Sequence, residues 1–271
     1  MSIARRTRDQ IAARVAQDIP EGAYVNLGIG LPTLVGNHLP PGREIFLHSE
    51  NGILGMGPAP PKGAEDWDLV NAGKQPVTLL AGGAYFHHAD SFGMMRGGHL
   101  DICVLGAFQV AINGDLANWH TGAPDAIPAV GGAMDLAVGA RRTYVMMEHQ
   151  TKSGESKLVA HCTYPLTGVG CVKRVYTDLA TIDITPAGLV AIDWVEGLEC
   201  CSVIGKHPAQ NRTHKYVRVG DEHSFAHKVH VRHSFSFARS GRFASYSDAK
   251  GALAERRLFW RFLPTSARER L

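Results

Sequence analysis

Short apolar runs separated by polar or glycine-containing segments recur along residues 1–199. Seven of these runs predict β-strands, at 23–27, 44–48, 77–80, 102–105, 144–147, 175–178 and 189–192. Apolar residues at helical spacing predict a helix that begins with a capping box of Thr7 and Gln10, and a second helix is expected at 33–39. Strands that alternate with helices indicate an α/β domain whose open, mostly parallel sheet is covered by helices.

The pattern ends near residue 199. Beyond it Ser, His, Arg and Phe interleave without a helical or alternating period, and only 248–262 suggests a basic helix. Residues 1–200 carry 14 Lys and Arg against 20 Asp and Glu, whereas residues 201–271 carry 14 against 5. We interpret the chain as one domain at 1–199 and an irregular basic extension at 200–271, disordered or derived from a frameshift. A genuine appendage that binds the acidic domain, another chain of the enzyme or nucleic acid is the alternative.

The bulk composition is typical of a globular enzyme, with 45% hydrophobic residues among 271. No apolar run reaches the roughly 18 residues of a membrane helix, and no apolar stretch follows the N-terminal arginines as in a secretory signal. An Arg-rich organellar presequence is a weaker alternative, because the helix after Thr7 leaves little length for a leader. Five scattered cysteines without a Cys-x-x-Cys pair favour a reduced, cytoplasmic protein.

Residues 47–55, with the sequence LHSENGILG, place one carboxylate in a setting suited to chemistry. Glu50 follows the predicted strand 44–48, and the glycines after it are expected to end regular structure and to let the backbone approach a ligand. No Lys or Arg lies between Arg43 and Lys62 to pair with it. A structural loop glutamate that accepts backbone N–H groups is the alternative.

The string at 47–55 closely resembles the active-site signature of the β subunits of 3-oxoacid coenzyme A-transferases. Other segments also resemble this family and occur in the same order as in its members, at 24–32, 82–92, 96–101, 131–136 and 163–168. The segment 114–130 resembles the 3-oxoadipate-specific members rather than the acetoacetate-specific ones.

This resemblance implies a nucleophilic role for Glu50, which would carry CoA from succinyl-CoA to 3-oxoadipate as a glutamyl-CoA thioester, in the degradation of aromatic compounds. It places Gly131 in the oxyanion hole, and Gly132 is a second candidate because its backbone can also approach the carbonyl. The chemistry needs no metal and no permanently bound cofactor, since CoA and succinyl-CoA are substrates and a carboxylate is already an anion.

Further residues are expected to bind substrate or CoA. They are Gly28, Gly30, Asn51 and Gly52, and also Arg96 and His120, which could meet the second carboxylate of a dicarboxylic substrate. The resemblance further implies a partner, the α subunit of a CoA-transferase, in an α2β2 assembly. We expect no membrane association and no nucleic-acid partner.

Several alternatives remain open from the sequence. The same fold could serve an acetoacetate-specific transferase or an acyl-CoA hydrolase, and the basic extension could mark a nucleic-acid-binding protein. Residues 28–33 lack the third glycine of a dinucleotide-binding fingerprint, which disfavours nicotinamide binding. His87, His88 and Asp90 could ligate a metal, but they lack a distant matching pair.

Overall fold

A computed structural model describes residues 3–198 and 215–216 of the chain. The described residues belong to the first of two units, Met1–Val229, and the second unit is His230–Leu271. The predictions of an irregular extension, a basic helix at 248–262 and a frameshift at about residue 200 therefore fall outside the described residues, apart from 215–216.

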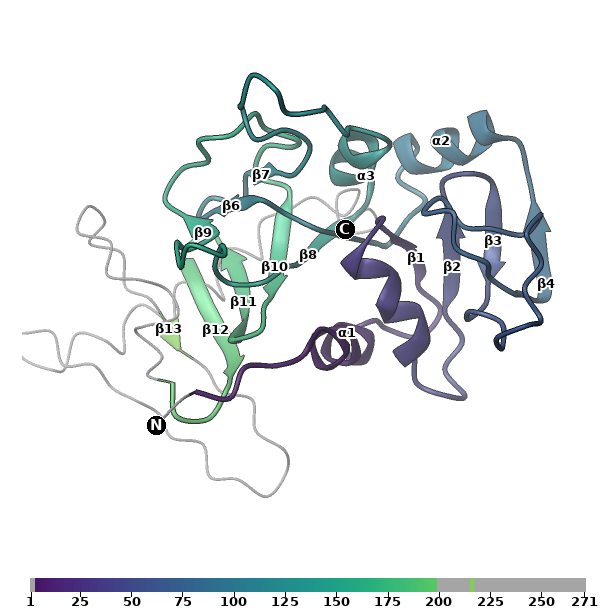
Figure 1. Cartoon of the computed structure of the whole chain (residues 1–271), viewed down its shortest axis with the longest axis horizontal. Coiled ribbons are helices and arrows are strands. Elements are labelled where there is room, and N and C mark those ends of the chain that lie inside the picture. The colour runs from purple at the N-terminus through teal and green to yellow at the C-terminus, as the bar shows by residue number, and fades with distance from the viewer. Residues whose placement is uncertain (1–2, 199–214, 217–271) are drawn as a thin grey trace, which may run out of the picture. The chain divides into compact units, whose positions relative to one another are not determined.

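The described chain contains a ten-stranded sheet in the order β13-β12-β11-β10-β8-β5-β1-β2-β3-β4 (Figure 1). Its strands are β1 (Tyr24–Leu27), β2 (Phe46–Ser49), β3 (Ile53–Met56), β4 (Leu79–Tyr85), β5 (Ile102–Leu105), β8 (Arg142–Met146), β10 (Val172–Tyr176), β11 (Ala180–Thr185), β12 (Gly188–Trp194) and β13 (Lys215–Tyr216). A second, three-stranded sheet has the order β7-β6-β9, with β6 (Gln109–Ala111), β7 (Leu116–Ala117) and β9 (Leu158–Val159).

The centre of the large sheet is parallel, as the sequence predicts. Strands β2, β1, β5, β8 and β10 run parallel to their neighbours, so their carboxyl ends meet at one edge. Antiparallel pairs flank this centre, β2-β3-β4 on one side and β10-β11-β12 on the other. The sheet is therefore parallel where ligands are expected and mixed towards its ends.

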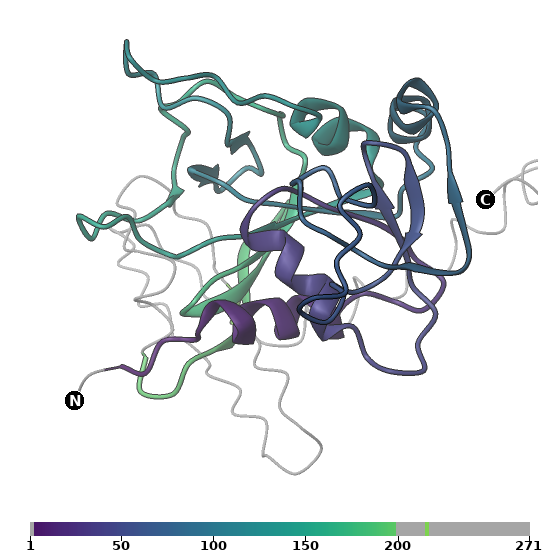
Figure 2. The same cartoon turned by 45° about the vertical axis from the view of Figure 1, so that its right-hand side comes forward.

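Both faces of the central strands are buried, because alternate residues of each strand enter different cores. Ile102 and Val104 of β5 pack in one core with α1 (Arg8–Gln17) and η1 (Leu31–His38). Cys103 and Leu105 pack in the other with α2 (His88–Arg96), α3 (Ala133–Gly139) and the small sheet. Helices α2 and α3 lie side by side in both views (Figures 1 and 2).

The first helix begins as predicted. The Thr7 side chain accepts a hydrogen bond from the backbone of Gln10, and the Gln10 side chain accepts one from the backbone of Thr7. Its apolar face is fully buried. On its polar side Arg14 pairs with Asp18 at 2.5 Å and with Asp193 of β12 at 2.8 Å, which ties the helix to the antiparallel end of the sheet.

Three predictions from the sequence need correction. The glycines after Glu50 do not end regular structure, because Ile53–Met56 forms β3 and Gly55 occupies an irregularity in its pairing with β4. Residues 77–80 are not a buried parallel strand, since β4 starts at Leu79, is antiparallel and is largely exposed as a sheet edge. The helix at 33–39 is a 3-10 helix that starts earlier, at Leu31.

None of the helices in the described part of the chain is long and apolar enough to cross a membrane.

Candidate active site

A cavity of about 730 Å³ opens at the carboxyl ends of four neighbouring parallel strands. Gly28 follows β1, Glu50 follows β2, Gly106 follows β5 and Met147 follows β8, and all four residues line it. Parallel sheets place their ligand sites at this edge. The fold therefore brings Glu50 to the position where a substrate is expected.

Glu50 lies in the tight turn that connects β2 to β3. The turn closes with a hydrogen bond from the amide of Gly52 to the carbonyl of Ser49, 2.9 Å long. Gly52 has φ +108°, and a Cβ there would overlap the carbonyl oxygen of Phe86. Only glycine fits both constraints, so Gly52 fixes the backbone from which Glu50 projects.

The Glu50 carboxylate lies against the backbone that begins α3. The amide of Gly132 donates a hydrogen bond to it, and a Cβ on Gly132 would overlap its Oε2. Gly131 has φ +49°, and a Cβ there would lie 3.9 Å from Oε1. The two glycines predicted to surround the reacting carbonyl are thus in contact distance of Glu50.

The pKa of the Glu50 carboxyl is raised, and burial is the main cause. The exposed His88 and the Gly132 amide act in the opposite direction, while the negative charge of Asp135 adds to the rise. A half-buried carboxylate is less solvated than one in water, and this makes it a stronger nucleophile at neutral pH. The sequence suggested His88 as a metal ligand or as part of a loop that shapes the substrate cleft or the subunit contact, and the structure gives it an electrostatic effect on Glu50.

A buried hydrogen-bond chain supports the end of β2 next to Glu50. Burial lowers the pKa of His48 to about 4, so its imidazole is neutral at pH 7. The side-chain amide of Asn26 in β1 donates to Nδ1 of His48 at 3.0 Å. Nε2 of His48 therefore carries the proton and donates to the Ser91 hydroxyl of α2, also at 3.0 Å. These three side chains join β1, β2 and α2 beside the reacting residue.

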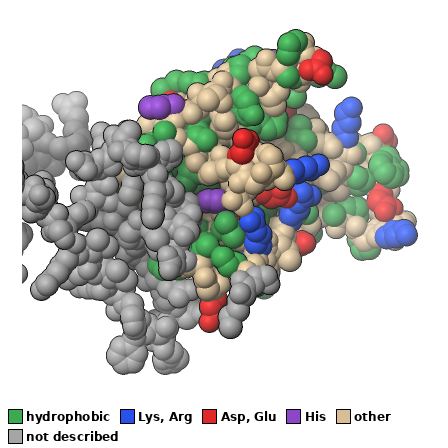
Figure 3. Space-filling model, turned by 60° about the vertical axis from the view of Figure 1, so that its left-hand side comes forward, with side chains coloured by type: hydrophobic (Ala, Val, Ile, Leu, Met, Phe, Trp, Pro, Cys, Tyr) green, Lys and Arg blue, Asp and Glu red, His purple; other side chains and the backbone are tan. Residues whose placement is uncertain are grey.

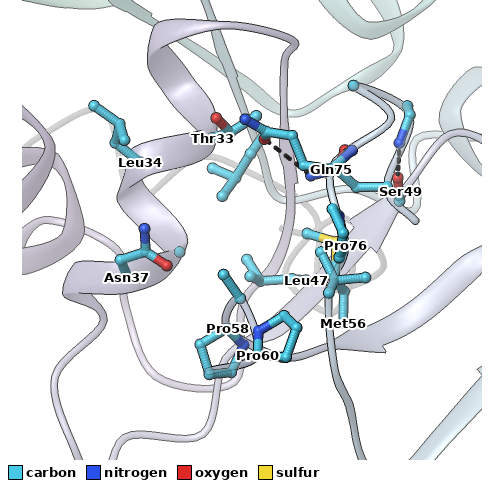
Figure 4. Close-up of a pocket in the computed structure, with 18 of the residues that line it drawn as sticks. Thr33, Leu34, Asn37, Leu47, Ser49, Met56, Pro58, Pro60, Gln75 and Pro76 are labelled. Carbon is cyan, nitrogen blue, oxygen red and sulfur yellow. Dashed lines mark hydrogen bonds between the residues drawn. The ribbon is translucent and has the colours of Figure 1, made fainter. Parts of the chain in front are cut away.

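A second cavity of about 340 Å³ lies between η1 and β2 (Figure 4). Thr33, Leu34 and Asn37 of η1 face Leu47 and Ser49 of β2 across it. Ser49 is fixed by the amide of Ala72, which donates to its hydroxyl at 3.0 Å. Glu50 does not line this second cavity, so the carboxylate opens into the first one alone.

Charged side chains that the sequence did not single out also line the cavity of Glu50. They are Arg8, Glu148 and Lys157. Arg8 and Glu148 form an ion pair of 2.8 Å with each other. Burial is the main cause that lowers the pKa of Lys157, while Glu148 and Asp178 oppose this effect. All three residues are far from Glu50 in sequence, and no local motif joins them to it.

Most of the remaining predicted site residues do not line this cavity. Gly28 lines it, and Asn51 in the turn donates to the carbonyl of Val70 at 2.8 Å. Gly30 precedes η1 and does not line the cavity.

Arg96 and His120 do not line the cavity. Arg96 pairs with Asp135 at 2.6 Å, and His120 contacts the backbone of residues 122 and 126 within its own loop.

The described residues contain no group of three or more His, Cys, Asp or Glu side chains arranged to hold a metal ion. The His87, His88 and Asp90 segment instead begins α2, where the His87 ring accepts a hydrogen bond from the Ala89 amide at 3.1 Å.

Comparison with known proteins identifies the family of the chain. Residues 8–194 match the family model described as coenzyme A transferase. The chain belongs to this family.

More particularly, it is 68% identical over 198 residues to the B subunit of the 3-oxoadipate CoA-transferase of Acinetobacter baylyi, covering 73% of this chain and 91% of that protein. It is 46% identical over 207 residues to the B subunit of the succinyl-CoA:3-ketoacid coenzyme A transferase of Helicobacter pylori, covering 76% of this chain and 99% of that protein.

Among solved structures, an acyl-CoA transferase of Escherichia coli O157:H7 in a thioester complex with CoA has the same fold. The TM-score is 0.58 at 17% identity, and the match covers 79% of this chain and 42% of that chain. The described chain thus spans about two-fifths of the length of that larger protein.

Proposed function

We propose that the chain is the β subunit of a transferase that moves CoA from succinyl-CoA to 3-oxoadipate. The observation that carries the proposal is the position of Glu50, in a cavity at the carboxyl ends of the parallel strands and hydrogen-bonded to the Gly132 amide. A carboxylate that is partly desolvated and has space for a ligand suits covalent group transfer.

In the first half-reaction a Glu50 oxygen attacks the thioester carbonyl of succinyl-CoA. The carbonyl electron pair moves to oxygen, returns, and expels CoA thiolate to leave a mixed anhydride. The thiolate then attacks the Glu50 carbonyl, and succinate leaves. The product is a Glu50–CoA thioester and free succinate, and no proton is gained or lost.

The second half-reaction reverses these steps with 3-oxoadipate. Its carboxylate attacks the Glu50 thioester, CoA thiolate leaves, and the thiolate attacks the acyl carbonyl of the new anhydride. The Glu50 carboxylate is restored and 3-oxoadipyl-CoA is released. The amides of Gly131 and Gly132 are the candidate donors to the oxyanions formed on Glu50, and each such donor contributes about 3–4 kcal/mol in other acyl transfers.

The choice of acceptor rests on the relatives. Identity is 68–69% to proteins named as B subunits of 3-oxoadipate CoA-transferase and 46% to one named as the B subunit of succinyl-CoA:3-ketoacid transferase. The designation of these relatives as B subunits supports a partner of the α type, and we propose an α2β2 assembly that acts in the degradation of aromatic compounds. The Glu50 cavity is open in the described chain, and a second subunit would close it against water.

The test is direct. The two-subunit enzyme incubated with succinyl-CoA and no acceptor is expected to hold CoA covalently on Glu50, detected by peptide mass spectrometry and released by hydroxylamine. Glu50→Gln is expected to abolish both the adduct and turnover, because the amide is not a nucleophile. Asp90→Asn, which changes an exposed carboxylate of α2, is the matched control and is expected to retain both. A Glu50→Gln enzyme, free of deamidation, with normal turnover would contradict the mechanism.

A further inference from the structure

The charges that line the Glu50 cavity do not balance once the reaction begins. Its four charged residues are Arg8, Glu50, Glu148 and Lys157. Arg8 and Glu148 form a 2.8 Å ion pair, so Glu50 and Lys157 carry the two remaining charges of the lining, and the anions that raise the pKa of Lys157 are Glu148 and Asp178. When Glu50 becomes an anhydride or a thioester it loses its charge, and the cavity then holds one uncompensated cation.

Lys157 is suited to receive an anionic ligand. Its side chain is half-buried, and it has no ion-pair partner within 4 Å among the described residues. Its backbone is fixed on both sides, since its amide donates to the His149 carbonyl and its carbonyl accepts from the Val110 amide, each at 2.9 Å. The backbone that carries the Lys157 ammonium group is thus held in place by these two hydrogen bonds.

We propose that Lys157 binds the distal carboxylate of the acyl group, the carboxylate that succinyl-CoA and 3-oxoadipate both carry at the end away from the reacting carbonyl. This inference rests on the proposed function of Glu50. It names the chemical class of acyl group that the cavity selects, a dicarboxylic one. It also assigns to Lys157 the binding of the second substrate carboxylate, for which the sequence suggested Arg96 and His120. Neither Arg96 nor His120 lines the cavity.

The lowered pKa of Lys157 agrees with this role, because burial without a close counter-ion disfavours its charge and a bound carboxylate would restore it. The phosphates of CoA are the other anions that an ammonium could bind. They lie at the far end of the pantetheine arm, whereas Lys157 shares with Glu50 the cavity that must hold the short acyl group.

The test compares two donors that differ only at the distal group. Succinyl-CoA carries a carboxylate where butyryl-CoA carries a methyl group, and both carry the same CoA phosphates. In the two-subunit enzyme, Lys157→Gln is expected to slow CoA transfer to Glu50 from succinyl-CoA by about 10- to 100-fold, because a charge-assisted hydrogen bond is lost. Transfer from butyryl-CoA is expected to stay within about twofold of the wild type.

Three controls make the outcome decisive. Lys157→Arg keeps the cation and is expected to retain most of the preference for succinyl-CoA. Lys152→Gln makes the same change at an exposed position of the preceding turn and is expected to alter neither donor. The second half-reaction gives an independent measure, with 3-oxoadipate and 3-oxohexanoate as the matched acceptors.

Equal slowing of both donors by Lys157→Gln would overturn the proposal, since it would place Lys157 on the CoA phosphates or in the fold. An unchanged preference for succinyl-CoA would overturn it as well. Failure of the wild-type enzyme to form any CoA adduct on Glu50 would instead refute the proposed function on which the inference depends.

Discussion

Glu50 combines two demands that oppose each other at the scale of a single residue. In the proposed mechanism it must ionise to act as a nucleophile, yet its burial raises the pKa of its carboxyl and disfavours the ionised form. The Gly132 amide and His88 offset part of this effect, while Asp135 increases it. Stability at neutral pH is therefore lowered at this position in favour of reactivity, as is common at functional sites.

Glu50→Gln is accordingly expected to stabilise the chain at neutral pH. A carboxyl whose folded-state pKa lies above its unfolded value contributes stability that is fully present below the unfolded value and is lost as the pH rises through the folded one. The amide avoids this loss, so the variant should unfold at a higher temperature than the wild type at pH 7. Thermal unfolding followed by circular dichroism measures it.

The advantage should disappear below pH 4.5, the ordinary pKa of a glutamate, because the wild-type carboxyl is then protonated in both states. Glu155→Gln removes an exposed carboxylate and serves as the control, with no expected gain. A lower midpoint for Glu50→Gln at pH 7 would show that Glu50 is held by favourable interactions that the structure does not contain.

At the scale of elements, the site is defined by the meeting of the β2-β3 turn with the start of α3. Gly52 and Gly132 both exclude a Cβ, but for different reasons. The Cβ of residue 52 would collide with the backbone of Phe86, whereas that of residue 132 would collide with the Glu50 carboxylate and lie 3.3 Å from Phe92. Gly52 is therefore required by the packing of the backbone, and Gly132 by the position of the Glu50 carboxylate.

Gly132→Ala is therefore expected to impair turnover with little effect on folding. Gly132 has φ −85°, which alanine adopts readily, so the backbone need not change. The Glu50 side chain must move, and the Phe92 ring must shift slightly. A shift of about 1 Å in a reacting group reduces rates by about 100-fold. Steady-state transferase assays and thermal unfolding of the same preparation separate the two effects.

Gly93→Ala is the control for that substitution. Gly93 lies in α2, and a Cβ there would meet no atom within 4 Å, so both activity and stability should be retained. Normal turnover in Gly132→Ala would mean that the Glu50 carboxylate can leave its position against α3 without loss of activity.

The sequence predicted those elements whose boundaries are marked locally. The strand at 102–105 is four apolar residues between Asp101 and Gly106, and its predicted limits are those of β5. Strand β3 was missed because glycine at residue 55 argues against a strand in isolation, whereas its close approach to Gly83 of β4 requires a residue without a side chain.

The site shows the same division between local and tertiary information. Glu50 and Gly131 were predicted from the resemblance of short motifs, and Gly132 from the close approach that its backbone allows. The structure brings the three residues together. Arg8 and Lys157 could not be predicted as neighbours, because their approach to Glu50 depends on the order of strands in the sheet. The basic extension at 200–271 stays a prediction.

At the scale of the whole molecule, the described chain exposes large apolar side chains near its cavity. Ile29 lines the cavity and is 62% exposed, and Val138 of α3 is 75% exposed. On the face shown in Figure 3, hydrophobic side chains lie among charged side chains of both signs. Apolar surface beside a site that is open to water is typical of a surface that a partner covers.

We therefore expect the isolated chain to lack transferase activity and to gain it when the α subunit is supplied. Val138→Glu is expected to weaken this association by about 10-fold or more, since it would bury an unpaired carboxylate. The activity recovered during titration with the α subunit measures the affinity. Ser153→Glu places the same charge on an exposed turn and is the control. Full activity from the chain alone would contradict the need for a partner.

The cavity walls come from residues 28, 50, 106, 132 and 147, which successive parallel strands bring together from over a hundred residues of chain. Parallel neighbours cannot be joined by tight turns, so their pairing closes long loops, a step that is slow in folding. No early folding intermediate that lacks β8 can contain this cavity. With the α subunit supplied in excess, recovery of catalysis after dilution from denaturant should consequently follow the addition of β8 to the sheet, later than the recovery of helical signal from α1.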